Sequence, residues 1–458
     1  MIMRKTLITL TVCLSLLIAG LCRGADEPHV VLITIDGFPA YMFWDPKTPI
    51  PRIRELAAEG VASEGLRICN PTVTWPNHTT LVTGVSAAKH WVLFNGVLLR
   101  AGPGLPVKID DKCDKAELVS VNTIFDVLHE HGYRTAAIDW PCTLKSDALE
   151  DNFPDVPDHL LHTTPRLRQE LMAEGILTNE TDASFEALGG TQHDEIWTKA
   201  ACLVLQRRKP HLLLLHLLNT DGVHHRYGPQ SPPSYRALGL ADGFVGQVLD
   251  ALNAAGIRQN TTVFVTADHG FARATNILQP NVLLRQHGLL ELGTNNQITK
   301  ARAQVVPEGG SGMVYLTNPE TRAADRQKAL ELFSGKEGIA EVIQPNQYAA
   351  LGLPSPKENP AMADLVLAAR DGYAFSGSAE GDEFVVPVGP YVNRGYHGYL
   401  ASNSNMNAAF IVAGRGIKRG IKIGFAENVD LAPTIAHLLG QKLAQADGKV
   451  LKKVLLSP

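Results

Sequence analysis

The stretch His29–Gly37, HVVLITIDG, decides the fold that we expect for this chain. Its first seven residues are largely apolar and β-branched, which is the composition of a strand buried on both faces of a parallel sheet. The run stops at Asp36 and Gly37, so the end of the strand delivers Asp36 to a loop. Ligands of α/β proteins collect at the carboxyl ends of such strands. Asp36 is therefore a candidate site residue.

Three further apolar runs end at or just before an aspartate in the same way, namely at Asp139, Asp221 and Asp268. Stretches with helical patterning lie between the runs, at Val121–His131, Asp194–Gln206 and Tyr235–Ala255. Strands that alternate with helices predict an α/β fold with a mainly parallel sheet flanked by helices. The aspartates should then meet at one edge of that sheet.

Two regions, Leu98–Leu118 and Gln279–Asn359, break this alternation because they are richer in Gly, Pro and polar residues. The second contains a helical stretch at Pro319–Phe333. After it the chain returns to a strand, AAFIVAG, and a closing helix at Val429–Leu439. We expect one catalytic domain over residues 25–458, with a small inserted subdomain at about 279–359.

The N-terminus has the features of a secretory signal peptide. Two basic residues precede an apolar run at Leu7–Leu21, and small and polar residues follow it. The prediction is a signal peptide at 1–24 and an exported protein, secreted or periplasmic. The run is short for a membrane span, and no other long apolar segment follows, so no span is expected. Lipid attachment at Cys22 is the less favoured alternative, because Leu21 before it is bulky.

Composition limits the remaining classes of function. A net charge of -4 over 458 residues gives no basic field for a polyanion, which disfavours a protein that coats nucleic acid. The oligomeric state leaves no trace in the sequence. In an oxidising compartment the remaining cysteines could form up to two disulfides in three pairings, although free buried thiols or one structural bridge are favoured over a catalytic role. These cysteines are Cys69, Cys113, Cys142 and Cys202.

The stretch Thr74–His78, TWPNH, offers a hydroxyl nucleophile. Thr74 would attack poorly at neutral pH unless a cation stabilised its alkoxide. Pro76 suits the first turn of a helix, whose N-terminus favours anions such as phosphate. Asn95, in HWVLFNG, offers an amide donor to a phosphoryl oxygen. On spacing alone, however, Asn95 before Gly96 is better explained as a turn residue.

Two pairs of residues suit metal binding. Asp268 and His269 follow a buried strand and present an oxygen and a nitrogen ligand, which both suit Zn²⁺. Asp221 and His225 are four residues apart in DGVHHRYGP, a predicted loop whose glycines let both side chains reach one ion. His224 is a rival to His225.

Single residues complete the candidate site. His397, in RGYHGY, would more often be structural if it stood alone, and Asp36 before Gly would commonly cap a turn. Both become candidate metal ligands because the other predicted oxygen and imidazole ligands accompany them. His78 and His216 suit packing or hydrogen bonding behind the ligands better than direct ligation. Together the residues predict a two-metal site beside Thr74, and hence a phosphoryl-transfer enzyme.

The motifs occur in an order that resembles the nucleotide pyrophosphatase/phosphodiesterases, or type I phosphodiesterases, of the alkaline phosphatase superfamily. The resemblance covers most of the mature chain and implies an alkaline-phosphatase-like core with two Zn²⁺ ions. By motif position, one ion would take Asp36, Thr74, Asp268 and His269, the other would take Asp221, His225 and His397, and Asn95 would contact the phosphate. The motifs are VLITIDGF, NPTVTWPNHTTLVTG, HWVLFN, IDWPC, DGVHHRYGP, VTADHG, GYHGY and VDLAPTIAHLLG.

This resemblance implies a hydrolase that cleaves phosphodiester or pyrophosphate bonds through a covalent threonine intermediate, with nucleotide-type small molecules as the favoured substrates. Trp75, His224 and Trp91 depart from the residues usual in the family, which leaves the substrate open. Phosphomonoesters or phosphonates are the second alternative, and the absence of Arg or Lys beside Thr74 in the sequence mildly favours diesters. A non-catalytic binding protein that retains its metals is the third. Sulfate esters are disfavoured because the chain has no C-x-P-x-R motif.

Overall fold

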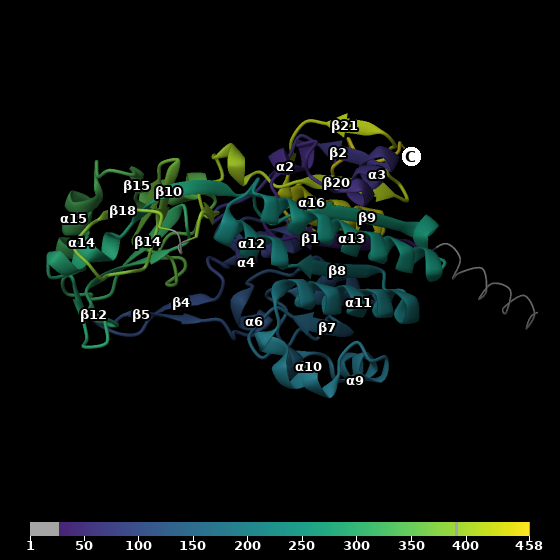
Figure 1. The fold of residues 1–458 in the computed structure, drawn as a ribbon, viewed down its shortest axis with the longest axis horizontal. Coiled ribbons are helices and arrows are strands. Elements are labelled where there is room, and N and C mark those ends of the chain that lie inside the picture. The colour runs from purple at the N-terminus through teal and green to yellow at the C-terminus, as the bar shows by residue number, and fades with distance from the viewer. Residues whose placement is uncertain (1–26, 390–392, 458) are drawn as a thin grey trace, which may run out of the picture.

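An eight-stranded sheet forms the centre of the larger part of the molecule (Figure 1). The structure is a computed structural model that describes residues 27–389 and 393–457. In spatial order the strands are β21 (Ile421–Ile423), β2 (Val61–Ser63), β20 (Phe410–Gly414), β9 (Thr261–Thr266), β1 (His29–Ile35), β8 (Leu212–Leu217), β6 (Thr135–Trp140) and β7 (Asp151–Pro154).

The decisive strand β1 lies inside this sheet, parallel to β8 on one side and to β9 on the other. Val30 is opposite Leu212 of β8 and Thr262 of β9. All seven residues of β1 are buried, as its composition predicted. The strands β6 and β7 continue the parallel order, while β20 is antiparallel to β9. The sheet is therefore mainly parallel.

Helices cover the sheet in two packed groups. In the first, α13 (Pro232–Ala254) packs on α11 (Gly190–Arg208) and α3 (Pro51–Glu59). The second consists of α4 (Thr74–Thr83), α7 (Ile124–Glu130) and α16 (Leu431–Leu438). The helical patterns in the sequence correspond to α7, α11, α13 and α16, with ends displaced by a few residues.

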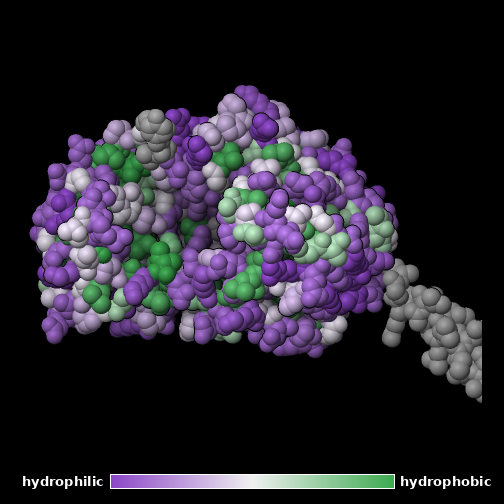
Figure 2. All heavy atoms as spheres, turned by 60° about the horizontal axis from the view of Figure 1, so that its bottom comes forward, coloured by the Kyte–Doolittle hydropathy of each residue, from purple (hydrophilic) through white to green (hydrophobic). Residues whose placement is uncertain are grey.

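A smaller lobe lies beside the central sheet and carries its own apolar core (Figure 1). Its antiparallel sheet has the order β13 (Ala303–Pro307), β14 (Ser311–Leu316), β16 (Leu365–Ala369), β15 (Ile339–Ile343). Figure 2 shows that the molecular surface is hollowed between the two parts. The other elements of the lobe are β10 (Ala272–Leu278), α14 (Pro280–Gln286), β11 (Leu290–Leu292), β12 (Ile298–Ala301), α15 (Arg322–Phe333), β17 (Gly372–Phe375), β18 (Val385–Pro387) and β19 (Gly395–Tyr396).

A hairpin from the larger part reaches this lobe. It consists of β4 (Val97–Arg100) and β5 (Val107–Asp110), and the Gly104 carbonyl between them accepts a hydrogen bond from the Ala301 amide at 2.8 Å. The lobe includes strands on both sides of residues 279–359. The division of the chain into one catalytic domain with an insertion at that range stays a prediction.

Two other expectations concern the termini and the cysteines. The signal peptide predicted at 1–24, with Cys22, lies outside the described residues. The four later cysteines are all free thiols in the structure. Among the described residues, none of the helices has the length and apolar composition to cross a membrane.

The burial of Glu308, between β13 and β14, should make the stability of the folded protein depend on pH. Its Oε2 accepts a hydrogen bond from Ser311 at 3.0 Å, while its buried Oε1 has no partner within the described residues. Burial raises the pKa of Glu308 from 4.5 to about 8, against the Ser311 hydrogen bond, which lowers it. The folded protein thus keeps a proton that the unfolded chain loses, so the free energy of unfolding falls as the pH rises from 4.5 to about 8.

The Glu308→Gln variant should lose this dependence, because its amide does not ionise. Between about pH 5 and pH 8, its melting temperature should fall by a few degrees less than that of the wild type. Thermal denaturation followed by circular dichroism at both pH values measures the difference. Parallel pH profiles for the two proteins would show that Glu308 ionises without cost.

Candidate active site

The carboxyl edge of the central sheet brings the predicted metal-binding residues together. Asp36 follows β1 directly, and Asp268 lies just beyond the end of β9. Asp221 lies in α12 (Asn219–Tyr227), the helix that follows β8. Because β1, β8 and β9 are adjacent and parallel, their ends place these three carboxylates at one edge.

Asp36, Asp268 and His269 form the deeper part of the site, and each is at most 1% exposed. His269 Nε2 lies 3.3 Å from Asp36 Oδ1 and 3.3 Å from Asp268 Oδ2. The other oxygen of Asp268 accepts hydrogen bonds from the backbone amides of Gly37 and His269, at 3.1 and 3.0 Å. These bonds fix the Asp268 carboxylate and leave its Oδ2 directed at the histidine.

Asp221, His225 and His397 form the outer part. Asp221 Oδ1 lies 3.4 Å from His225 Nε2 and 3.6 Å from His397 Nε2. The His397 ring stacks on His269 with a centroid distance of 3.8 Å, which joins the two parts. Potential ligand atoms lie within 4.8 Å of one another in two groups, Asp221/His225/His397 and Asp36/Asp221/His269.

Hydrogen bonds fix the orientation of all three histidine rings. Nδ1 of His269 donates to the Gly270 carbonyl, that of His225 to Gly395, and that of His397 to Thr72, at 3.0–3.1 Å. Each Nε2 then turns its lone pair toward the carboxylates, which is the arrangement of metal-ligating histidines.

The buried donor atoms fit a metal centre. Asp36 Oδ1, Asp221 Oδ1, Asp268 Oδ2 and His269 Nε2 are buried and have no hydrogen-bond partner within the described residues. Buried polar atoms are normally satisfied, and these four converge on the same space. Oxygen and imidazole donors in this combination suit Zn²⁺.

Burial changes the proton affinity of these groups in opposite directions. It raises the pKa of Asp36 well above the ordinary value, with the charge of Asp268 as the second cause. It also raises the pKa of Asp221 to about 6, against the effect of His225. The pKa values of His269 and His397 are lowered well below 6.5, first by burial, so both imidazoles are neutral and able to ligate. A bound cation would favour the carboxylate forms of the two aspartates.

The stretch around Asp221 was predicted as a loop, and this was wrong. It forms the helix α12, in which Asp221 and His225 share a face because they are four residues apart. The rival His224 is fully buried, donates from Nδ1 to the Gly37 carbonyl at 3.1 Å, and is absent from the two groups of potential ligands.

Thr74 is the first residue of α4, so its hydroxyl lies at the N-terminus of a ten-residue helix. Asn95 Oδ1 accepts a hydrogen bond from the Trp75 amide at 2.9 Å. This bond fixes the Asn95 side chain and leaves its Nδ2 as the donor. Thr74 and Asn95 both line a pocket of about 440 Å³, together with Asp36, Asp221, His225 and His397. Asp268 and His269 lie beneath it.

Two histidines support the site from below. His78 Nδ1 donates a hydrogen bond to the Thr74 carbonyl at 2.9 Å. Its Nε2 lies 2.8 Å from Thr34 Oγ1 and 3.1 Å from His216 Nδ1. His216 Nε2 lies 3.3 Å from Asp36 Oδ2. The sequence suggested such a supporting role for both residues but gave no sign that His216 would contact Asp36.

The sequence analysis missed the acidic wall of this pocket. Asp155 accepts a hydrogen bond from Trp75 Nε1 at 3.0 Å and lines the pocket with His159 and Glu186. Asp155 and His159 are four residues apart, the spacing that drew attention to Asp221 and His225, so the signal was present in the sequence.

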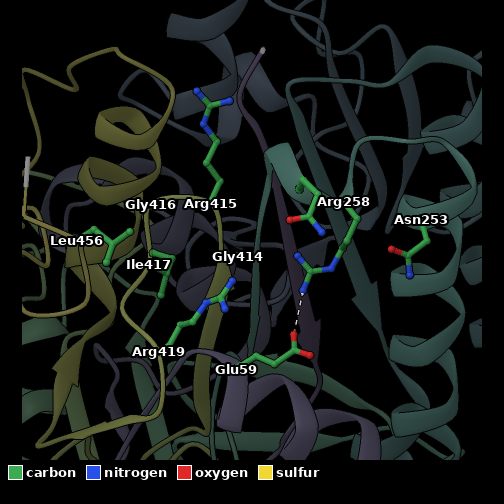
Figure 3. A pocket seen from close by; sticks show the side chains of 10 residues that line it. Glu59, Asn253, Arg258, Gly414, Arg415, Gly416, Ile417, Arg419 and Leu456 are labelled. Atoms are coloured by element: carbon green, nitrogen blue, oxygen red, sulfur yellow. Dashed lines mark ion pairs between the residues drawn. The ribbon is translucent and has the colours of Figure 1, made fainter. Parts of the chain in front are cut away.

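A larger pocket of about 510 Å³ lies elsewhere, beside the start of β9 and the end of β20. Figure 3 shows the Arg258–Glu59 ion pair in this pocket, with an N–O distance of 3.5 Å. Since β9 is parallel to β1, its start lies at the edge of the sheet opposite the predicted metal-binding residues. This pocket therefore belongs to a different face from the candidate active site.

Comparison with known proteins identifies the family of this chain and agrees with its fold. The model of the type I phosphodiesterase / nucleotide pyrophosphatase family matches residues 30–400. The chain belongs to that family. The family prediction from the sequence motifs is thereby confirmed.

Individual relatives are distant. Human ectonucleotide pyrophosphatase/phosphodiesterase family member 1 is 24% identical over 441 residues, which cover 93% of this chain and 41% of the relative. The chain thus spans about two fifths of the length of that protein. Bovine bis(5'-adenosyl)-triphosphatase ENPP4 is 24% identical over 446 residues, or 94% of this chain and 83% of the relative.

Solved structures confirm the predicted fold class. Human ectonucleotide pyrophosphatase/phosphodiesterase 5 superposes with a TM-score of 0.70 at 17% identity, covering 94% of this chain and all of the other. An inactive variant of the murine protein, in complex with AMP, gives a TM-score of 0.69 at 18% identity. At this identity the likeness shows a shared fold.

Proposed function

We propose that this chain is an exported two-zinc hydrolase that cleaves phosphodiester or pyrophosphate bonds through a covalent intermediate on Thr74. The observation that carries the proposal is the convergence of four orphaned, buried ligand atoms next to a hydroxyl at a helix N-terminus. Asp36, Thr74, Asp268 and His269 would hold one Zn²⁺ ion. Asp221, His225 and His397 would hold the other.

When bound, the two ions would supply Lewis-acid stabilisation of the attacking and leaving oxygens. Thr74 Oγ1 attacks phosphorus in line with the leaving oxygen, so that the new O–P bond forms as the bond to the leaving group breaks. The N-terminus of α4 favours the phosphoryl anion, and Asn95 Nδ2 donates to a non-bridging oxygen. Water then attacks phosphorus and the bond to Thr74 Oγ1 breaks. A proton from the water restores the hydroxyl of Thr74, and the phosphomonoester product leaves.

Nucleotide-type substrates are the class that we favour. The family description and the bovine triphosphatase both refer to nucleotides, and a structural relative has been captured with AMP. Trp75 follows the nucleophile, and it anchors the pocket wall through its hydrogen bond to Asp155.

Hydrolysis of bis-p-nitrophenyl phosphate and of p-nitrophenyl phosphate tests the proposal. The purified protein is assayed with Zn²⁺, and the Thr74→Ala variant serves as the blank. Faster turnover of the diester, lost in the variant, would support the phosphodiesterase proposal and justify a screen of dinucleotides and nucleotide sugars. Preference for the monoester would instead assign the chain to phosphatase chemistry, and no turnover of either would overturn the proposal.

Asn95→Ala should lower kcat for the diester by about 10²-fold to 10³-fold, because a fixed donor to a developing oxyanion is lost. Steady-state kinetics with bis-p-nitrophenyl phosphate measure the change, and zinc content measured on the same samples should stay at the wild-type value. A kcat within about twofold of the wild type would leave Asn95 as a structural contact to Trp75 alone.

A further inference from the structure

A second cluster of potential ligands lies beside the active-site pocket, at the ends of β6 and β7. It consists of Asp139 in β6, Asp155 just after β7, and His159 at the start of α8 (His159–His162). One ligand atom from each lies within 4.8 Å of the others. None of these three residues belongs to the two-zinc site proposed above.

Asp139 is aimed into this cluster by an irregularity of its strand. The register of β6 against β7 shifts between Ile138 and Trp140, so Asp139 is the extra residue of a bulge. Its backbone has φ 55°, in the left-handed region that a non-glycine residue rarely adopts. In a regular strand, without the bulge, the Asp139 side chain would have a different direction.

The carboxylate of Asp139 has no compensation for its burial. The residue is 0% exposed, and both Oδ1 and Oδ2 lack a hydrogen-bond partner within the described residues. His159 Nε2 is 4.0 Å from Asp139 Oδ1 and 4.0 Å from Asp155 Oδ1, which is too long for hydrogen bonds. A buried carboxylate is costly unless it is protonated or paired with a cation, and none of the described side chains donates a hydrogen bond to Asp139.

His159 is oriented as a ligand. Its Nδ1 lies 3.0 Å from both carboxylate oxygens of Glu186. Because a carboxylate only accepts, Nδ1 carries the proton, and in the neutral imidazole Nε2 turns a lone pair toward Asp139 and Asp155. A lone pair that faces two ionised carboxylates has no hydrogen-bond donor in reach, whereas a cation between them would take it as a ligand. The carboxylate–histidine–metal arrangement has this geometry.

We propose that Asp139, Asp155 and His159 bind a third divalent cation of the zinc class, with Glu186 as the group that orients His159. Two carboxylate oxygens and one imidazole nitrogen form a mixed donor set suited to Zn²⁺. Three protein ligands leave a coordination position for water or for a substrate atom.

The cation would act on the active site through Trp75. Asp155 Oδ2 accepts the hydrogen bond from Trp75 Nε1 at 3.0 Å, while Oδ1 faces His159. One carboxylate therefore links the cation to the residue that follows the nucleophile. A bound cation would also neutralise the acidic wall formed by Asp155 and Glu186, which otherwise repels an entering phosphoryl anion.

The zinc content of the full chain tests this proposal. Wild-type protein and variants are stripped with a chelator, reloaded with Zn²⁺, desalted and measured by inductively coupled plasma mass spectrometry. Asp139→Asn and His159→Asn should each retain one zinc equivalent fewer than the wild type. Asp250→Asn, which changes an exposed aspartate in α13, should match the wild type. His159 lines the pocket, so the zinc content of His159→Asn can be measured even if a change at the fully buried Asp139 impairs folding.

Anomalous diffraction at the zinc edge provides a second reading, with a peak expected between Asp139, Asp155 and His159. Equal zinc content in wild type, Asp139→Asn and His159→Asn would overturn the proposal and identify Asp139 as a buried protonated carboxyl. The outcome of this zinc measurement does not depend on whether the proposed two-zinc active site is correct. If Asp221→Asn left zinc content unchanged, the main site would be refuted, whereas the loss of one equivalent in Asp139→Asn would still stand.

Discussion

Thr74→Ala should abolish hydrolysis of bis-p-nitrophenyl phosphate, with a fall in kcat of about 10⁴-fold or more. In the proposed mechanism the side chain of Thr74 supplies the oxygen that forms the bond to phosphorus, and the methyl group of alanine offers no nucleophile in its place. Asp36, Asp268 and His269 remain, and their buried positions are set by β1 and β9, so zinc content should stay near the wild-type value. Stopped assays give kcat, and metal analysis of the same preparation gives the zinc content.

Thr74→Ser is the matched variant, because it keeps a hydroxyl at the first position of α4. It should retain far more activity than Thr74→Ala, and acid quenching during turnover should trap a p-nitrophenylphosphoryl group on the wild-type protein and the serine variant only. Full activity of Thr74→Ala would exclude the covalent mechanism and would move the attack to a water molecule.

The positions of the candidate metal-binding residues were predictable because they follow from strand order. Asp36 and Asp268 stand at the ends of fully buried apolar runs, and such runs form the interior strands of a parallel sheet. Once the runs are parallel neighbours, their final residues share an edge. The motif order assigned Thr74 to one predicted ion and His397 to the other, which the spacing alone could not do.

Local conformation around Asp221 was less predictable. Gly222 and Gly228 suggested a loop, yet Gly222 lies inside α12, and Gly228 ends the helix with φ 77°. A glycine after the last turn is typical of a helix end, so the second glycine had the opposite meaning from the one assigned to it. The predicted contact of Asp221 with His225 arises from helical spacing rather than from a flexible backbone.

The cluster of Asp139, Asp155 and His159 depends on features that a pattern of apolar residues does not contain. The run RTAAID ends at Asp139, but the bulge that turns this side chain is set by the pairing of β6 with β7. The antiparallel sheet of the smaller lobe was also beyond prediction, because β14 pairs with β16 across about fifty residues of intervening chain. Such pairing is decided by tertiary packing and not by local propensity.

Asp221→Asn should remove about one zinc equivalent per chain and lower kcat by about 10³-fold or more. Asp221 Oδ1 lies between His225 Nε2 and His397 Nε2, and it belongs to both groups of potential ligands of the main site. An amide is a much weaker ligand than a carboxylate, and a metal ion that stabilises a leaving oxygen contributes several kcal/mol to the barrier. Each 1.36 kcal/mol corresponds to a factor of about ten in rate.

The Asp250→Asn variant is the control, since that carboxylate lies on the surface of α13 and pairs with Arg52 at 3.1 Å. It makes the same chemical change without touching the site, so zinc content and kcat should both remain at wild-type values. A gradual return of Asp221→Asn activity at high Zn²⁺ concentration would show that weaker ligation is the cause. Wild-type zinc content with unchanged kcat would remove Asp221 from the ligands and leave His225 and His397 without the carboxylate that joins them.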